Sequence, residues 1–296
     1  MATLAKGRVS RIVGWAVVLT ATWVGLIQVW APAILQTQNQ FAGNVAEAER
    51  YIYGSGPVRT LVVGSSMVEW LDLLTDGEIQ VLGMNGMSAR EALEIVLRSG
   101  RFPDRLAVEL NGLTAPANEG FVGRLVNPWL SAIRRNVLAF RTEYQPASVI
   151  MSLAKQGFGR NSGRTGPAPA PPGLAELRAK QLHDQYRQPP DMDRLRANLR
   201  FVRDAVAELE RRGVRVTYFE FPVPHGLAKT PFHLTRRAAN AEILGAAAAK
   251  AVVFDDEAFA TTDGIHLIPE DLQRVAFSLL EMLEASSPGA APTASR

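Results

Sequence analysis

The feature that most constrains this chain is a long uncharged stretch near its N-terminus. Residues 12–46 carry no charge, and residues 12–35 are apolar almost throughout. At about 1.5 Å per residue, the apolar part extends roughly 36 Å as a helix, enough to cross the hydrocarbon core of a bilayer. Lys6, Arg8 and Arg11 precede it, and no basic residue follows closely. We therefore expect residues 12–35 to be a single-pass transmembrane anchor.

The same charge pattern predicts the orientation of the chain. Residues 1–11 are expected in the cytoplasm, with the anchor in the cell inner membrane and the main domain periplasmic. The alternative is a cleaved signal peptide, with Ala31-Pro32-Ala33 as a small-residue cleavage site. The apolar part is longer than the 7–15 residues usual in signal peptides, and Pro fits poorly at such a site. Either way, the rest of the chain lies outside the cytoplasm.

Short apolar strands alternate with helical patterns along the rest of the chain. The predicted strands are residues 61–63, 79–82, 106–110, 214–221 and 251–254. The predicted helices are residues 67–74, 88–97, 128–141, 191–211 and a last one that begins at Pro269. This alternation is typical of an α/β fold with a central parallel sheet, here of about five strands, covered on both faces. Ligands of such sheets bind beyond the carboxyl ends of the strands.

The chain is expected to form one main domain, residues 57–285, behind a linker or stalk at residues 36–56. A helical and loop insertion is predicted at about residues 113–190. It contains the segment 157–173, in which nine of 17 residues are Gly or Pro, so this segment is expected to be flexible. The small-residue tail, residues 286–296, is expected to be disordered.

Composition excludes several classes of function. The chain has no cysteine, which removes disulfides, Cys-zinc sites, Fe–S clusters and thiol nucleophiles. A net charge of +3 is too small to indicate a nucleic-acid partner. The basic residues are mostly Arg, but Asp and Glu are interleaved with them, which indicates a solvated surface. The four histidines include no i, i+4 pair of the zinc-protease type, so we expect no metal and no cofactor.

Three residues have the chemistry of a nucleophilic hydrolase. Ser66 follows the first strand at a turn into a helical pattern, where it is either a helix cap or a nucleophile. The Gly-x-Ser-x-Gly elbow of α/β-hydrolases is excluded because position 68 is Val. Asp263 comes three residues before His266, just ahead of the last helix, and its carboxylate could orient the imidazole. The alternative is a turn Asp beside a surface His.

With these residues in place, the chain resembles the SGNH (GDSL-type) hydrolase family. Residues 64–66 resemble its Gly-Asp-Ser block, and Met84-Asn85-Gly86 resembles its glycine block. Asn111 resembles the asparagine of the third block, and residues 263–266 match Asp-x-x-His. Two departures stand out: Ser65 replaces the usual Asp, and the third block, usually Gly-x-Asn-Asp, reads Glu109-Leu110-Asn111-Gly112.

The resemblance implies a three-layer, flavodoxin-like fold and a triad. Ser66 would be the nucleophile, His266 the base and Asp263 its orienting carboxylate. The oxyanion would be bound by the N–H groups of Ser66 and Gly86 and by the amide of Asn111.

The resemblance also implies substrates and partners. Membrane-anchored members with Gly-Ser-Ser at this position are similar to accessory proteins of cell-surface O-acylation. We therefore expect an esterase or O-acyltransferase acting on acyl esters of cell-envelope glycans, with acetyl as the expected acyl group. The alternatives are a catalytically silent polysaccharide-binding module and an accessory subunit of a membrane-embedded acyltransferase. Ser65 and His225 are further candidates for substrate contact, and His233 flanks the same loop as His225.

Overall fold

The computed structural model describes residues 2–32, 34, 37–69, 71, 79–157, 173–223, 225–249, 251–253, 259–262 and 265–285. The chain divides into two compact units. Unit 1 consists of Met1–Gly54 and Leu125–Gly163, and unit 2 consists of Ser55–Arg124 and Arg164–Arg296. Each unit therefore contains two separate stretches of the chain.

Unit 2 is built on a parallel sheet. Its four longer strands are β1 (Thr60–Ser65), β2 (Gln80–Met84), β3 (Arg105–Glu109) and β4 (Arg215–Glu220). The two-residue strand β5 (Val252–Val253) pairs with the end of β4, and the order across the sheet is β2-β1-β3-β4-β5. All of these pairings are parallel. The expected α/β class with a parallel central sheet is confirmed.

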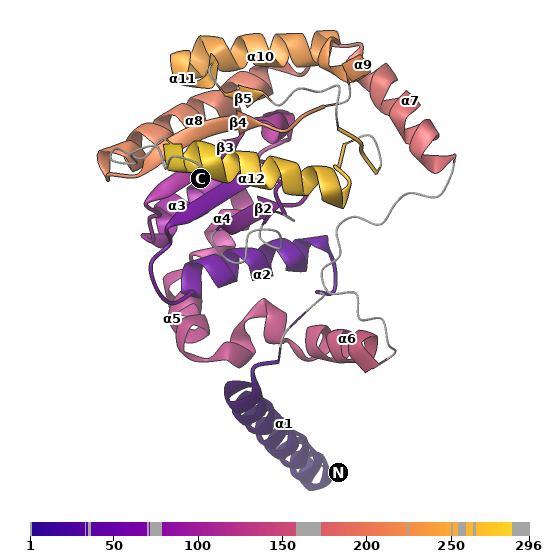
Figure 1. Cartoon of the computed structure of the whole chain (residues 1–296). Helices are drawn as coiled ribbons and strands as arrows, with labels where there is room; N and C mark the ends of the chain where they lie inside the picture. The colour runs from indigo at the N-terminus through magenta and orange to yellow at the C-terminus, as the bar shows by residue number, and fades with distance from the viewer. Residues whose placement is uncertain are drawn as a thin grey trace, which may run out of the picture. The chain divides into compact units, whose positions relative to one another are not determined.

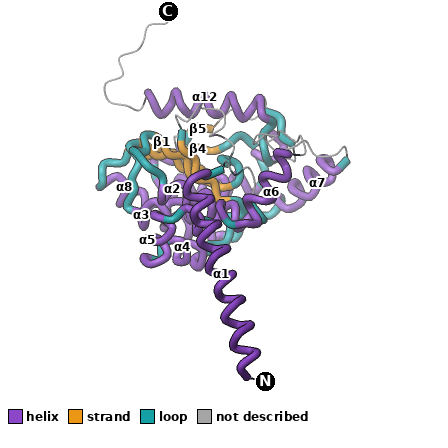
Figure 2. The backbone as a smooth tube through the Cα atoms, turned by 90° about the horizontal axis from the view of Figure 1, so that it is seen from below, coloured by secondary structure: helices purple, strands orange, loops and turns teal. Residues whose placement is uncertain are grey.

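Helices cover both faces of this sheet. α12 (Pro269–Ala285) packs its apolar side, including Val275 and Leu279, on one face. α3 (Ala89–Ser99) contacts β1 and β2, and α8 (Met192–Arg211) contacts β4. Figure 2 shows α12 on one side of the strands and α3 and α8 on the other. Buried strand residues alternate between the two faces, which is why the strands are apolar along their whole length.

The helix boundaries follow from local sequence signals. Ser88 and Glu91 form a capping box at the start of α3, and Gly100 ends that helix in a left-handed conformation. Asp191 caps α8 by accepting a hydrogen bond from the N–H of Arg194. Pro269 occupies the first position of α12.

Unit 2 also contains shorter helical elements and the helices α7 and α10. They are η2 (Asn111–Thr114), α4 (Glu119–Leu125), α7 (Leu174–Tyr186), α9 (His225–Ala228), α10 (Pro231–Leu244) and α11 (Ala246–Ala249). α10 packs against α7, α8, α9 and α11. Its first turn places Phe232 and His233 beside Tyr186 of α7.

Unit 1 is helical. Its elements are α1 (Ala2–Trp30), α2 (Gln40–Tyr53), α5 (Pro128–Asn136), η3 (Leu138–Phe140), η4 (Thr142–Tyr144) and α6 (Pro146–Gly157). α1 is long and apolar enough to cross a membrane over Ser10–Trp30, and little of it is buried. It ends at Trp30, short of the position expected from sequence, and Ala31-Pro32 follows. The residue before a proline is disfavoured in helical geometry, which accounts for the earlier end.

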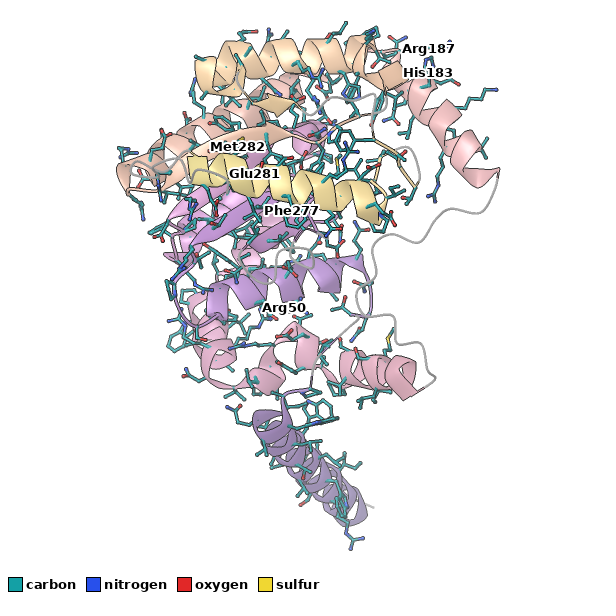
Figure 3. The ribbon with its side chains drawn as sticks, in the orientation of Figure 1. Arg50, His183, Arg187, Phe277, Glu281 and Met282 are labelled. Carbon is teal, nitrogen blue, oxygen red and sulfur yellow. The ribbon has the colours of Figure 1, made fainter. Side chains whose placement is uncertain are left out.

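The segment expected as a linker contains α2, which packs against residues 137–145. Glu49 is fully buried and its carboxylate accepts a hydrogen bond of 2.6 Å from the N–H of Thr142. Arg134 of α5 lies 3.0 Å from the same carboxylate. Arg50 extends from α2 (Figure 3) and its Nε donates to Glu143 at 2.8 Å. In Figure 1, α5 to α6 form a layer between α2 and the end of α1.

Two predicted helices and the two segments expected to be loose differ from the structure or lie partly outside its described residues. The helix predicted over residues 128–141 ends at Asn136, because Val137 is extended, and two 3-10 turns follow. The helical pattern after Ser66 begins as a turn over residues 66–69, and most of residues 70–78 lie outside the described part of the chain. Two segments were expected to be loose, residues 157–173 and 286–296. Residues 158–172 of the first and all of the second also lie outside the described part.

Candidate active site

Ser66 stands at the carboxyl edge of the sheet, on the turn that follows β1. The N–H of Val68 donates to the carbonyl of Ser65, and the N–H of Glu69 donates to the carbonyl of Ser66. Gly64 is needed just before this turn, because a Cβ there would lie 2.7 Å from the Cβ of Glu109 and 2.8 Å from Val68. Ser66 itself is half-buried, so its hydroxyl is held in place without being sealed off.

The structure brings Ser66 and His266 together across 200 residues of sequence. The hydroxyl Oγ of Ser66 lies 3.0 Å from Nε2 of His266, which is hydrogen-bond distance. Asp263, the expected orienting carboxylate, lies outside the described residues. The proximity of a serine hydroxyl and an imidazole is the geometry that proton transfer to the ring requires.

The segment that carries His266 is held by hydrogen bonds within itself and to α12. The carbonyl of His266 accepts hydrogen bonds from the N–H and hydroxyl of Thr262, at 2.8 Å and 3.2 Å. Earlier in the same segment, the N–H of Ala260 donates at 2.6 Å to the carboxylate of Asp271, which lies in the first turn of α12. These bonds fix a segment that would otherwise be an irregular surface loop.

Two backbone N–H groups at the site have no hydrogen-bond acceptor among the residues that the structure describes. Within the described residues, neither the N–H of Ser66 nor that of Gly86 donates a hydrogen bond. Gly86 lies on the turn after β2 with φ of +69°, a conformation that other residues rarely adopt. Both residues line the same cavity. Free backbone donors at such a place can bind a developing negative charge on an oxygen.

The side chain of Asn111 makes two hydrogen bonds that the sequence did not indicate. Its Nδ2 donates to the carbonyl of Phe221 at 3.1 Å, and its Oδ1 accepts from the N–H of Phe221 at 2.8 Å. The amide therefore connects the end of β3 to the chain that follows β4. One of the two N–H groups of the amide is used in this way. The other N–H group is available to a further acceptor.

A buried glutamate lies beneath the turn that carries Ser66. Glu109 is fully buried, and its two carboxylate oxygens accept 2.8 Å hydrogen bonds from the N–H groups of Ser65 and Gly112. Burial raises the pKa of Glu109, although these donors and the nearby Arg236 act in the opposite direction. Glu109 joins the turns after β1 and β3, and the only sequence signal for it is a charge that ends an apolar strand.

A second buried cluster lies behind Asn111. Arg236 of α10 donates to the carbonyl of Asn111 at 3.1 Å and to Glu220 at 3.0 Å. Arg237 and Asn240 also donate to Glu220. No spacing in the sequence links α10 to the ends of β3 and β4, so this cluster could not be found from sequence.

A cavity of about 590 Å³ opens beside Ser66. Besides the residues already described, its wall includes Ser65, Met87, Tyr186, Phe232, His233 and Ile265. Ser65, a candidate for substrate contact, is buried and accepts a weak hydrogen bond from the N–H of Met67. His225 begins α9, and its side chain lies outside the described part of the structure.

His233 differs from the other histidines. It is 3 % exposed, and neither of its ring nitrogens has a hydrogen-bond partner among the described residues. Burial, together with Arg236 and Arg237, lowers the pKa of His233 to about 3, so its ring is neutral. The stacked rings of Tyr186 and Phe232, with centroids 4.4 Å apart, lie against it.

No protein-family model and no curated protein matches this chain. Among the described residues, no group of three or more His, Asp or Glu side chains is placed to hold a metal ion.

Proposed function

We propose that this protein is a membrane-anchored serine esterase or O-acyltransferase, and that unit 2 is an SGNH-type domain with Ser66 as its nucleophile. The observation that carries the proposal is the 3.0 Å contact between Ser66 Oγ and His266 Nε2 at the mouth of a cavity. A serine that only capped a helix would have no need of an imidazole at this distance. A surface histidine would have no need of the hydrogen bonds that fix its loop.

The reaction follows from the positions of these groups. His266 Nε2 takes the proton of Ser66 as Oγ attacks the carbonyl carbon of an ester, and the carbonyl oxygen becomes an oxyanion. The N–H groups of Ser66 and Gly86, with the second amide N–H of Asn111, would bind that oxyanion. The C–O bond to the alcohol then breaks, and the leaving alcohol receives the proton from His266. Asp263 is proposed to hold Nδ1–H of the ring from its place in the sequence.

The acyl-enzyme is resolved by one of two acceptors. Water gives an acid and makes the protein an esterase, whereas a second hydroxyl group receives the acyl group and makes it a transferase. We propose acyl esters of cell-envelope glycans as substrates, with the acetyl ester as the simplest case. A cavity of about 590 Å³ is far larger than an acetyl group needs, so it has room for the alcohol part of such a substrate.

The proposed location follows from α1. With the basic end of the chain in the cytoplasm and α1 across the inner membrane, unit 2 would act in the periplasm. A membrane-embedded acyltransferase is the partner that this arrangement suits if the protein works as a transferase.

The test is to measure whether Ser66 is a reactive serine. The full chain in detergent micelles is treated with a fluorophosphonate probe and assayed with p-nitrophenyl acetate. We expect labelling of the wild type that Ser66→Ala abolishes, and a loss of kcat/KM of about 10³-fold or more in Ser66→Ala and His266→Ala. Ser99→Ala, at the end of α3, and His183→Ala, on α7 (Figure 3), are the matched controls.

Two results would count against the proposal. Labelling that persists in Ser66→Ala would mean that another residue reacts. Equal turnover by the wild type, Ser66→Ala and His266→Ala would leave the catalytically silent polysaccharide-binding module as the better account.

A further inference from the structure

Unit 1 exposes an unusual amount of apolar surface beside the end of α1. On α5, Trp129 is 83 % exposed, and Ile133, one turn further, is 47 % exposed. On α6, Ile150 is 63 % exposed. The remaining members of this surface, which we call the α5–α6 surface, are Leu130, Phe140, Met151 and Leu153, each more than a third exposed. Isolated apolar side chains need no explanation on a protein surface, but a group of seven within 25 residues does.

This surface is attached to α1 well before that helix ends. The indole N–H of Trp23 donates to the carbonyl of Tyr144 at 3.2 Å. Ile27 is fully buried against Ala139 and Val149, and Gln28 accepts from the N–H of Leu138 at 3.3 Å. The last two turns of α1 are therefore packed against η3, η4 and α6, whereas residues 10–22 are exposed.

These contacts fix the depth of unit 1 if α1 crosses a bilayer. Residues 12–30 of a helix extend roughly 28 Å, which only just matches a hydrocarbon core of about 30 Å. Trp23 lies seven residues, or about 10 Å, before the end at Trp30. The backbone at Tyr144, which Trp23 contacts, must lie at that same depth. Part of unit 1 therefore has to enter the membrane.

We propose that the α5–α6 surface lies in the outer leaflet of the membrane, at the boundary between headgroups and acyl chains. The occupant is a lipid surface, and α5 and α6 are interfacial helices beside the transmembrane helix. Helices of this kind bury their apolar side roughly 5–10 Å below the headgroups, which agrees with the depth given by Trp23. An indole such as that of Trp129 is favoured at this level because it is apolar with one polar group.

The charges of the segment agree with a lipid partner. The described ionisable side chains of α5 are Arg134 and Arg135, at its C-terminal end. Arg134 pairs with Glu49, whereas Arg135 is exposed. Glu143, the acidic residue of the segment 125–154, is buried and pairs with Arg50. An exposed arginine beside an apolar surface suits anionic lipid headgroups, and no exposed carboxylate opposes them within the described residues of 125–154.

The test uses the full chain with one spin label in lipid nanodiscs that hold a single copy. Because the protein has no cysteine, Trp129→Cys, Ile133→Cys and Ile150→Cys each provide one labelling site. Leu19→Cys, in the middle of α1, is the control inside the membrane, and Arg203→Cys, exposed on α8, is the control in water. Each label is scored by its collision rates with oxygen and with a water-soluble nickel complex.

We expect the labels at 129, 133 and 150 to collide with the nickel complex at least about fivefold less often than the label at 203, and to retain high oxygen collision rates. Nickel collision rates equal to those at 203 would overturn the proposal, and so would a water-exposed label at 19. Low collision rates with both reagents would mean that protein covers these sites, which would also overturn it. None of these outcomes depends on whether Ser66 is reactive.

Discussion

At the scale of single residues, the candidate site depends on buried polar side chains that do not touch the reacting atoms. Glu109 fixes the turn of Ser65 to the turn of Gly112, and Gly112 itself has no room for a side chain. A Cβ at position 112 would lie 2.9 Å from the Cβ of Ser65. The position of Ser66, the proposed nucleophile, therefore depends on a carboxylate at the end of β3 and on a glycine in η2.

His233 gives a prediction of pH dependence. The pKa of its ring is about 3 in the folded protein and 6.5 when unfolded, so below pH 6.5 the unfolded state binds a proton that the folded state does not. The contribution of the neutral His233 ring to the free energy of unfolding is fully present above pH 6.5. It is lost progressively as the pH falls from 6.5 toward 3. We expect the wild type to lose about 2 kcal/mol more than His233→Phe between pH 7 and pH 5. Urea unfolding of both proteins in detergent at each pH gives the two free energies of unfolding. The same pH dependence in the wild type and in His233→Phe would contradict the prediction.

Asn111 gives a second prediction at this scale. Asn111→Ala removes both hydrogen bonds to Phe221 and leaves a buried backbone N–H and carbonyl unpaired. We expect the free energy of unfolding to fall by about 2–4 kcal/mol. If Asn111 served only as an oxyanion donor, kcat would fall about 10²-fold or more with the free energy of unfolding unchanged. Measuring both quantities on one preparation separates these two roles.

At the scale of elements, the site is the meeting of turns that follow different strands. The turns after β1, β2 and β3 supply Ser66, Gly86 and Asn111, because parallel strands place their carboxyl ends on one edge of the sheet. His266 comes from the connection into α12, whose first turn holds that connection through Asp271. A short connection fixed to a long helix can keep an imidazole in one place.

Asp271 is therefore expected to be a positioning residue. Asp271→Ala removes the acceptor for the N–H of Ala260, and the His266 segment should become less ordered. We expect kcat/KM for p-nitrophenyl acetate to fall about 10–100-fold. Asp271→Asn keeps one oxygen acceptor and should recover most of that loss. No recovery in Asp271→Asn, with both variants folded by circular dichroism, would contradict this role.

At the scale of the whole molecule, the two units have different tasks. Unit 2 holds the sheet and the candidate site, and unit 1 holds α1 together with the inserted helices α5 and α6. Unit 1 is formed from two distant stretches of chain that meet at the buried carboxylate of Glu49. Its stability therefore depends on these polar contacts as well as on the apolar cluster of Ile27, Ala139 and Val149.

Glu49→Ala should destabilise unit 1. It leaves the N–H of Thr142 without its acceptor and Arg134 without its partner, and breaking a buried ion pair costs about 3–5 kcal/mol. We expect trypsin to cleave at least about tenfold faster between residues 125 and 157. Glu242→Ala, which alters an exposed ion pair on α10, is the control and should leave the cleavage rate unchanged. Equal rates in both variants would contradict the role of Glu49.

The sequence alone determined the features that depend on local pattern. The apolar helix, the α/β class, the capped starts of α3, α5 and α8 and the start of α12 at Pro269 all follow from periodicity, capping residues and proline position. The pairing of Ser66 with His266 was also expected, from the chemistry of these residues and from the resemblance of short motifs.

Only the tertiary structure decided the rest. Several polar contacts join segments that are far apart in the sequence. They are the hydrogen bonds of Glu109 to the turn of Ser66, of Asn111 to Phe221, of Arg236 to Glu220 and of Glu49 to Thr142. Such contacts leave no periodicity or spacing to read, because a buried polar group can be satisfied by any partner that the fold brings within 3 Å. Local pattern fixes which elements form, whereas the choice among distant partners is made only when those elements pack.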